Sequence, residues 1–192
     1  MITKVSISDQ ATPALERLNA SFRSRVTPAV GAAVATLFQG HFDQLPSNKL
    51  NWPSTGFWKR AAQNTSFEIT GQNVAIKVDQ EGVGQRRFGG WIQARRSKWL
   101  TIPARAEAYG KSARDFGNLR FVPFARPYEA ALVEKTPASG LRISDVVVYW
   151  LKKAVYQSPD SKVTPSAAEI HTVAMQAVER VVDQAKRRGG NL

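Results

Sequence analysis

The sequence contains no cysteine and only two histidines among its 192 residues. The lack of cysteine excludes disulfides, thiolate nucleophiles and cysteine-based metal sites together. No apolar run approaches the length of about 18 residues that a membrane-spanning helix needs, so we expect no transmembrane helix. Met1 to Gln10 is polar and lacks the apolar region of a secretory signal, so export by that route is not expected. These absences favour a protein of a reducing cytoplasm.

Positive charge is what the sequence has in excess. Its 27 Lys and Arg against 15 Asp and Glu give a net charge of +12. Between Gly82 and Arg126, ten basic residues face only Glu107 and Asp115, so this segment carries +8 of the total. Such a local excess can steer or hold a polyanion. It also suits a basic solvent-exposed surface or one that meets an acidic protein, and both interpretations stay open.

The residue types that usually carry catalysis are scattered. His41 and His171 lie in predicted helices, without a carboxylate or second histidine at metal-ligand spacing. No serine occupies a Gly-x-Ser-x-Gly turn, and Tyr109-Gly110-Lys111 lacks the glycine spacing of a nucleotide-binding loop. We therefore predict no catalytic residue, no metal and no cofactor, and we expect a protein that is not an enzyme.

Apolar periodicity predicts helices at both ends of the chain. From Asp9 to Leu45, apolar residues recur mostly three or four positions apart. Pro28 lies inside this pattern and predicts a kink or break near Thr27 that divides the segment into two helices. The sequence Ser166-Ala167-Ala168-Glu169 is typical of a capping box and predicts the start of a C-terminal helix that ends near Arg188.

Alternating and β-branched residues predict strands between these helices. Ser66–Thr70 and Asn73–Asp79 flank Gly71-Gln72 and predict a hairpin with a two-residue turn. Glu81 to Gly84 is predicted to be a loop, and Phe57 to Ala62 a short helix. Further strands are predicted at Leu119–Phe124, Glu129–Lys135 and Ser144–Tyr156, the last interrupted at Lys152-Lys153 by a bulge or an edge.

Together these elements predict the α+β class. We expect a mixed or antiparallel sheet of about five to seven strands, packed by the N-terminal helical segment and the C-terminal helix. The length fits one domain over residues 1–192. Its parts would be a helical segment (1–45), a connector (46–65), a β-rich core with a basic hairpin (66–157) and a C-terminal helix (164–188).

The segment from Phe88 to Ala104 organises the rest of the chain. Gly89-Gly90 predicts a bulge or a close backbone approach before a first strand. A second apolar strand stops at Pro103, which cannot donate to a ladder. Basic residues from Arg95 to Lys98 join the two strands. The pattern therefore predicts a β-hairpin that displays a positively charged loop.

This segment, FGGWIQARRSKWLTIPARAEAYGKSARDF, resembles the central signature of the neck and tail-completion proteins of tailed phages and prophages. The strong part of the likeness covers about 30 residues, and the order of elements agrees more loosely over most of the chain. The matching residues are Gly89, Gly90, Ile92, Lys98, Leu100, Ile102, Pro103, Ala108 and Gly110. The resemblance implies a structural virion-assembly (minor tail) protein that acts as a ring component at the head–tail junction or tail terminus.

Partners and location follow from the same resemblance. It implies contacts with other virion proteins on the neck, tail-tube or portal side, homo-oligomerisation on assembly, and a place in the virion after assembly in the bacterial cytoplasm. The residues expected to face a neighbour or DNA are Arg86, Arg87, Arg95, Arg96, Lys98, Arg105 and Lys111. Those expected to be structural are Gly89, Gly90, Ile102, Pro103 and Gly110.

The alternative hypothesis is a nonspecific nucleic-acid-binding module. Aromatic residues are interleaved with the basic ones, and this combination is used by platforms that stack unpaired bases. The rings concerned are Phe88, Trp91, Trp99 and Phe121. No helix-turn-helix, zinc-finger or RNP pattern is present, so reading of a specific DNA sequence is not predicted.

Overall fold

The computed structural model describes residues 11–46, 52–71, 73–95, 97–123, 129–134 and 146–187. The chain divides into two compact units. The first comprises Met1–Asp43, Ala61–Gln80 and Thr164–Leu192, and the second comprises Gln44–Arg60 and Glu81–Val163. The compactness of each unit does not test whether both fold together. The single domain over residues 1–192 therefore stays a prediction.

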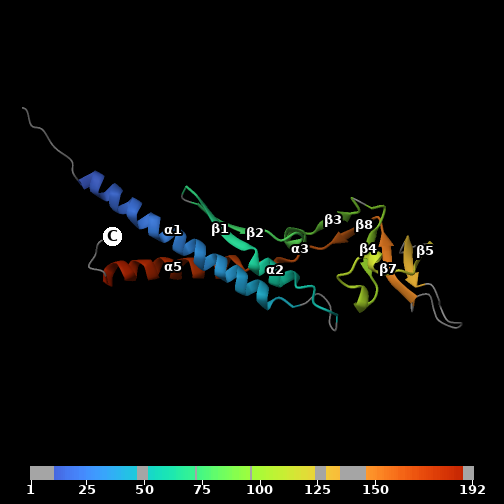
Figure 1. The fold of residues 1–192 in the computed structure, drawn as a ribbon. Helices are drawn as coiled ribbons and strands as arrows, with labels where there is room; N and C mark the ends of the chain where they lie inside the picture. The colour runs from blue at the N-terminus through green and yellow to red at the C-terminus, as the bar shows by residue number, and fades with distance from the viewer. Residues whose placement is uncertain are drawn as a thin grey trace, which may run out of the picture. The chain divides into compact units, whose positions relative to one another are not determined.

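Helix α1 of the first unit spans Ala11–Gln44 and runs through Pro28 without interruption (Figure 1). The predicted division into two helices near Thr27 is therefore wrong. Proline lacks an N–H, so it removes one hydrogen bond to the preceding turn. Val34 and Ala35 are buried in the turns that follow. This packing maintains the helix where its local propensity alone would favour a break.

Helix α5, Ala167–Arg187, begins with the predicted capping box. The Ser166 hydroxyl accepts from the Glu169 N–H at 3.2 Å, and the Glu169 carboxylate accepts from the Ser166 N–H at 2.7 Å. The Ser166 hydroxyl also donates to the Glu169 carboxylate at 2.7 Å, and this hydrogen bond, followed by the one from the Ser166 N–H, lowers the pKa of Glu169. The predicted start of this helix is therefore confirmed.

The two long helices lie antiparallel within the first unit (Figure 1). A groove of about 540 Å³ between them is lined by Leu37 together with Val173. A second hollow is lined by Arg25 together with Ala185, so the middle of α1 faces the last turns of α5. Small side chains, mainly alanine, line the wall that α1 contributes to the larger groove.

The predicted hairpin is confirmed as β1, Thr65–Thr70, and β2, Asn73–Val78. Thr70 pairs with Asn73 across the two-residue turn, and the backbone carbonyl of Thr65 accepts from Gln39 Nε2 at 3.0 Å. A Cβ at Gly31 of α1 would overlap the ring of Phe67 in β1. The missing side chain therefore lets the helix backbone approach the hairpin.

The second unit contains two separate antiparallel sheets. Strands β4 (Leu100–Pro103), β5 (Leu119–Pro123), β6 (Ala130–Glu134) and β7 (Val147–Lys152) form one in the order β4-β7-β6-β5. Strands β3 (Gly90–Gln93) and β8 (Ala154–Gln157) form a two-stranded ribbon. The α+β class is thus confirmed, but the described strands lie in three small antiparallel sheets and not in one.

Strand β7 is the centre of the second unit. Val147, Val148, Tyr149 and Leu151 are buried, as expected for a continuous apolar strand. The Tyr149 hydroxyl lies 3.2 Å from the carbonyl oxygen of Ala108 and 3.0 Å from that of Lys111. Burial, and secondly the charge of Asp115, raise the pKa of Tyr149. The hydroxyl therefore stays protonated and ties the central strand to the adjoining turns.

Short helical segments complete the unit. The two turns beside Tyr149 are η1 (Ala106–Ala108) and η2 (Ala113–Asp115). Helix α2 covers Phe57–Gln63, which confirms the predicted short helix; its residues up to Arg60 belong to the second unit and the remainder to the first. Helix α3, Val83–Phe88, begins inside the segment predicted as a loop, and η3 spans Ser161–Val163.

Candidate interaction surface on the second unit

Strands β3 and β4 do not form the predicted hairpin. Strand β3 pairs with β8 and β4 with β7, both antiparallel, so β3 and β4 run in the same direction along one partner segment. Gln93 is opposite Ala154 and Leu100 is opposite Lys152, with only Lys153 between these partners. The six residues 94–99 therefore leave the ladder as a loop opposite a single residue. We call residues 94–99 the basic loop.

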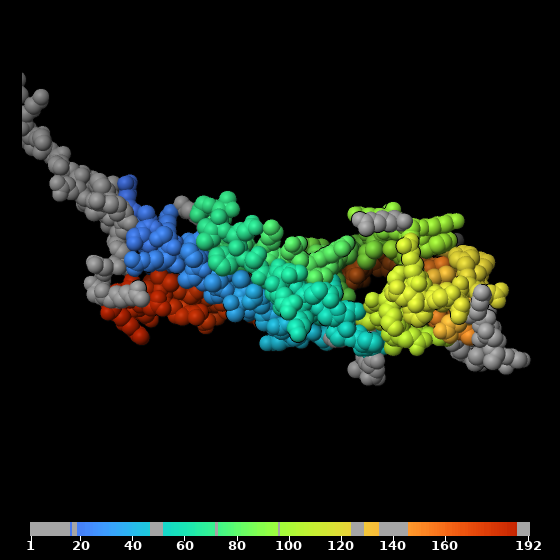
Figure 2. Space-filling view, in the orientation of Figure 1, coloured from blue at the N-terminus to red at the C-terminus, as the bar shows by residue number. Residues whose placement is uncertain are grey.

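The basic loop is held at both ends and exposes its charges. The Ala94 N–H donates to the Lys153 carbonyl at 3.2 Å, and the Ser97 hydroxyl donates to the Trp99 carbonyl at 2.6 Å. Arg95 and Lys98 are exposed, and within the described residues no carboxylate pairs with either. Arg96 lies outside the described residues. In the space-filling view, the light-green atoms of this part of the chain form an outer rim of the unit (Figure 2).

Trp99 closes the loop and is flanked by positive charge. Its ring centroid lies 5.8 Å from Nζ of Lys98 and 5.8 Å from Nζ of Lys153. Glu129 pairs with Lys153 at 3.4 Å, so part of that charge is neutralised. The ring of Phe121, which is 52% exposed on β5, lies 6.3 Å from Trp99. These cation–π contacts hold two ammonium groups beside an aromatic side chain.

The ribbon next to the basic loop carries a second group of exposed rings. Trp91 of β3 and Tyr156 of β8 are directly opposite each other, with centroids 5.5 Å apart and ring planes at 68°. They are 66% and 56% exposed, and Phe88, just before the ribbon, is 77% exposed. Large apolar side chains gathered on a surface mark an interaction site. We call Phe88, Trp91 and Tyr156 the ribbon aromatics.

Sequence reasoning identified two of the three ribbon aromatics and missed Tyr156. Phe88 and Trp91 lie in the organising segment, whereas Tyr156 lies at the end of the strand predicted over Ser144–Tyr156, beyond its interruption at Lys152-Lys153. Only the register of β3 against β8 brings Tyr156 beside Trp91. No pattern local to either strand carries that information.

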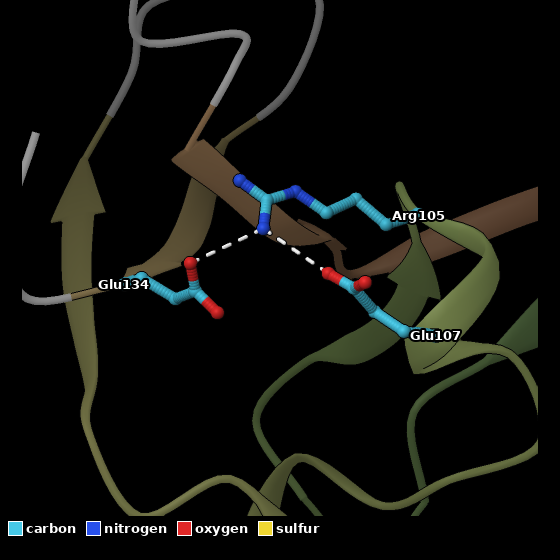
Figure 3. Close-up of polar contacts among 3 residues, drawn as sticks. All are labelled: Arg105, Glu107 and Glu134. Atoms are coloured by element: carbon cyan, nitrogen blue, oxygen red, sulfur yellow. Dashed lines mark hydrogen bonds and ion pairs between the residues drawn. The ribbon is translucent and has the colours of Figure 1, made fainter.

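Arg105 was predicted to face a partner, but its guanidinium is engaged inside the unit. Nη1 lies 3.2 Å from Glu107 in η1 and 3.2 Å from Glu134 in β6 (Figure 3). The arginine side chain is only 26% exposed. Arg105 thus links η1 to β6 through two ion pairs, and the two carboxylates offset its charge.

Arg86 likewise packs within the unit. Its guanidinium carbon lies 4.8 Å from the ring centroid of Phe57 and 5.3 Å from that of Trp58. Its backbone carbonyl accepts from the N–H of Asp160 at 3.0 Å. Arg87 lies over the ring of Phe88, at 5.6 Å, and Lys111 over that of Phe116, at 5.8 Å. Of the described basic residues predicted at the interface, Arg95, Lys98 and Lys111 are exposed, whereas Arg86, Arg87 and Arg105 are half-buried.

The residues predicted to be structural have identifiable roles. Gly89 has φ 69°, and a Cβ there would lie 2.6 Å from both the Gln157 carbonyl oxygen and the Pro159 nitrogen, which confirms the predicted close approach. Gly90 and Gly110 also have positive φ, at 115° and 79°. Pro103 ends the edge strand β4, where a missing N–H is tolerated, and Ile102 in the same strand pairs with Trp150.

Metal ligands do not gather in the described residues: no group of three or more His, Asp or Glu side chains is placed to hold an ion. No helix within the described ranges has both the length and the apolar character needed to cross a membrane. Comparison of the chain with protein-family models, with curated proteins and with solved structures finds no match to any of them. The likeness to tail-completion proteins therefore stays a prediction.

Proposed function

We propose that the chain is a structural virion-assembly protein of a tailed phage or prophage, which acts as a ring component at the head–tail junction or tail terminus. The observation that carries this proposal is the framework formed by the residues of the resemblance. Gly89 admits the close approach of the ribbon to Pro159, and Pro103 ends an edge strand. Between them, the basic loop links the strand that pairs with β8 to the strand that pairs with β7.

A ring requires two different surfaces on each subunit, because its contacts are head-to-tail. The four-stranded sheet has β4 at one edge and β5 at the other. Both edge strands end in a proline, Pro103 and Pro123, which limits how far a foreign strand can extend the sheet. In this proposal the two edges contact neighbouring subunits, and the basic loop meets the next virion protein.

Assembly can be tested in a phage or lysogen that encodes the chain. Deleting its gene should leave heads and tails that do not join, or tails without a finished end, as seen by electron microscopy. The double variant Arg95→Ala/Lys98→Ala should lower the infectious titre. The matched control Lys59→Ala/Arg114→Ala removes the same charge from exposed positions of the same unit and should leave the titre unchanged.

The genes that flank the chain provide an independent test. Portal, capsid or tail-tube genes beside it are the expected finding. Normal infectious particles from the deleted genome would overturn the proposal, whatever its neighbours are. A ring of the purified protein, or of the protein with those neighbours, would identify the assembled form directly.

A further inference from the structure

The net charge of the chain is concentrated in one of its two units. The second unit has 18 Lys and Arg against 7 Asp and Glu, a net charge of +11, whereas the first has 9 against 8, or +1. Repulsion between two such surfaces opposes the docking of a second copy through the same face. The charge therefore favours a polyanion as the occupant of the second unit.

The exposed aromatic side chains of the second unit indicate a partner with flat groups that can stack on them, which positive charge alone does not indicate. The Trp91 and Tyr156 side chains are fixed against each other by edge-to-face packing, yet most of their surface is exposed. Only three residues lie between Trp91 and Arg95, so their Cα atoms lie at most about 14 Å apart. Cations and open aromatic surfaces thus occur side by side, as in proteins that hold unpaired nucleotides.

We infer that the ribbon aromatics and the basic loop form a binding site for single-stranded nucleic acid. Bases stack on Trp91 and Tyr156, and phosphates lie against Arg95 and Lys98. An acidic protein segment would use the cations, but its carboxylates do not stack on aromatic rings as nucleic-acid bases do. A duplex buries its base faces in its own stack, so it meets the rings only after unstacking, which costs a few kcal/mol per base step.

This inference does not depend on the assembly of subunits into a ring. It concerns a surface that lies within the second unit, and it would hold for a chain that never enters a virion. Conversely, a ring protein whose second unit contacts only other proteins would satisfy the proposed function and fail this test.

The test is a titration of the full-length protein against fluorescently labelled oligo(dT) of about 30 nucleotides at several salt concentrations. Each stacked ring contributes about 1–3 kcal/mol, which corresponds to roughly 5- to 150-fold in affinity. Trp91→Ala and Tyr156→Ala should each weaken binding within this range without changing its salt dependence. Trp91→Phe, which keeps a ring, should retain most of the affinity.

Arg95→Ala/Lys98→Ala should behave differently. The loss of two phosphate contacts should make the negative slope of log K against log salt shallower by about 1.4, because each contact to a single strand contributes about 0.7 to its magnitude. The matched double variant Lys59→Ala/Arg114→Ala should change the slope less. Ile69→Ala/Met175→Ala, which removes exposed apolar side chains of the first unit, should change neither affinity nor slope.

Three results would overturn the inference. Wild-type affinity in the Trp91→Ala/Tyr156→Ala double variant would show that the rings do not contact bases. Equal effects of the two charge-removing variants would show that only the overall charge matters. Competition by poly-glutamate as effective as that by unlabelled oligo(dT) would indicate an acidic protein as the partner instead.

Discussion

Gly89 is the position at which a single methyl group should do most damage to the second unit. Its φ of 69° with ψ of −162° lies in a region that side chains other than glycine rarely adopt. Such a conformation costs of order 1–3 kcal/mol for another residue. In addition, an alanine Cβ would lie 2.6 Å from two backbone atoms, the Gln157 oxygen and the Pro159 nitrogen, which have no rotamer through which to withdraw.

We therefore expect Gly89→Ala to lower the free energy of unfolding by about 2–4 kcal/mol. Gly84→Ala is the matched control, since Gly84 lies in α3 and an added Cβ meets nothing within 4 Å. That change should be neutral or stabilise by about 0.5–1 kcal/mol, because alanine is the better helix former. The two substitutions are identical in chemistry and differ only in their surroundings.

Urea unfolding followed by tryptophan fluorescence suits this comparison. All five tryptophans lie in the second unit, so their emission reports on it alone. With a slope of about 2 kcal/mol per molar urea, Gly89→Ala should shift the midpoint down by about 1–2 M. Equal midpoints for the two variants would refute the close approach at Gly89. Circular dichroism is dominated by α1 and α5, so coincidence of the two signals also tests whether the units unfold as one domain.

Three further substitutions test individual contacts. Tyr149→Phe should destabilise the second unit by about 1–2 kcal/mol, whereas Tyr156→Phe, with its side chain exposed, should not. Because the folded pKa of Tyr149 is raised above its ordinary 10.0, wild-type stability should fall as pH rises past 10, and Tyr149→Phe should lose this part of the dependence in unfolding measured by fluorescence. Ser166→Ala should destabilise α5. In the wild type, the ionised Glu169 carboxylate stabilises the folded state above pH 4.5, and this contribution is lost as the pH falls through the lowered pKa of Glu169. The variant should therefore show a weaker loss of helix stability in acid, measured by circular dichroism. Arg105→Gln should cost about 1 kcal/mol by urea unfolding and leave the salt slope of oligo(dT) binding unchanged; a reduced slope would mean that Arg105 contacts phosphate.

Features that depend on neighbours in the chain were predictable from the sequence. The cap of α5 needs only Ser166 and Glu169, three residues apart, and the turn of the first hairpin needs only Gly71-Gln72. The burial of β7 follows from its unbroken apolar run, and the close approach at Gly89 from the paired glycines. In each case the physical cause acts over a few residues, so the types and spacing of those residues are enough to predict the feature.

Features that depend on a distant partner were decided by the tertiary structure. Pro28 does not break α1, because the packing of this helix within the first unit outweighs the loss of one hydrogen bond. The basic segment forms a loop between two strand pairs, because β3 pairs with β8 and β4 pairs with β7 on either side of Lys153. The same pairing places Tyr156 beside Trp91, while folding brings Glu134 to Arg105, so that part of the arginine's charge is neutralised within the unit. Strand partners and ion pairs of this kind join residues about 30 to 65 positions apart. The local sequence of a strand does not specify which distant segment will pair with it.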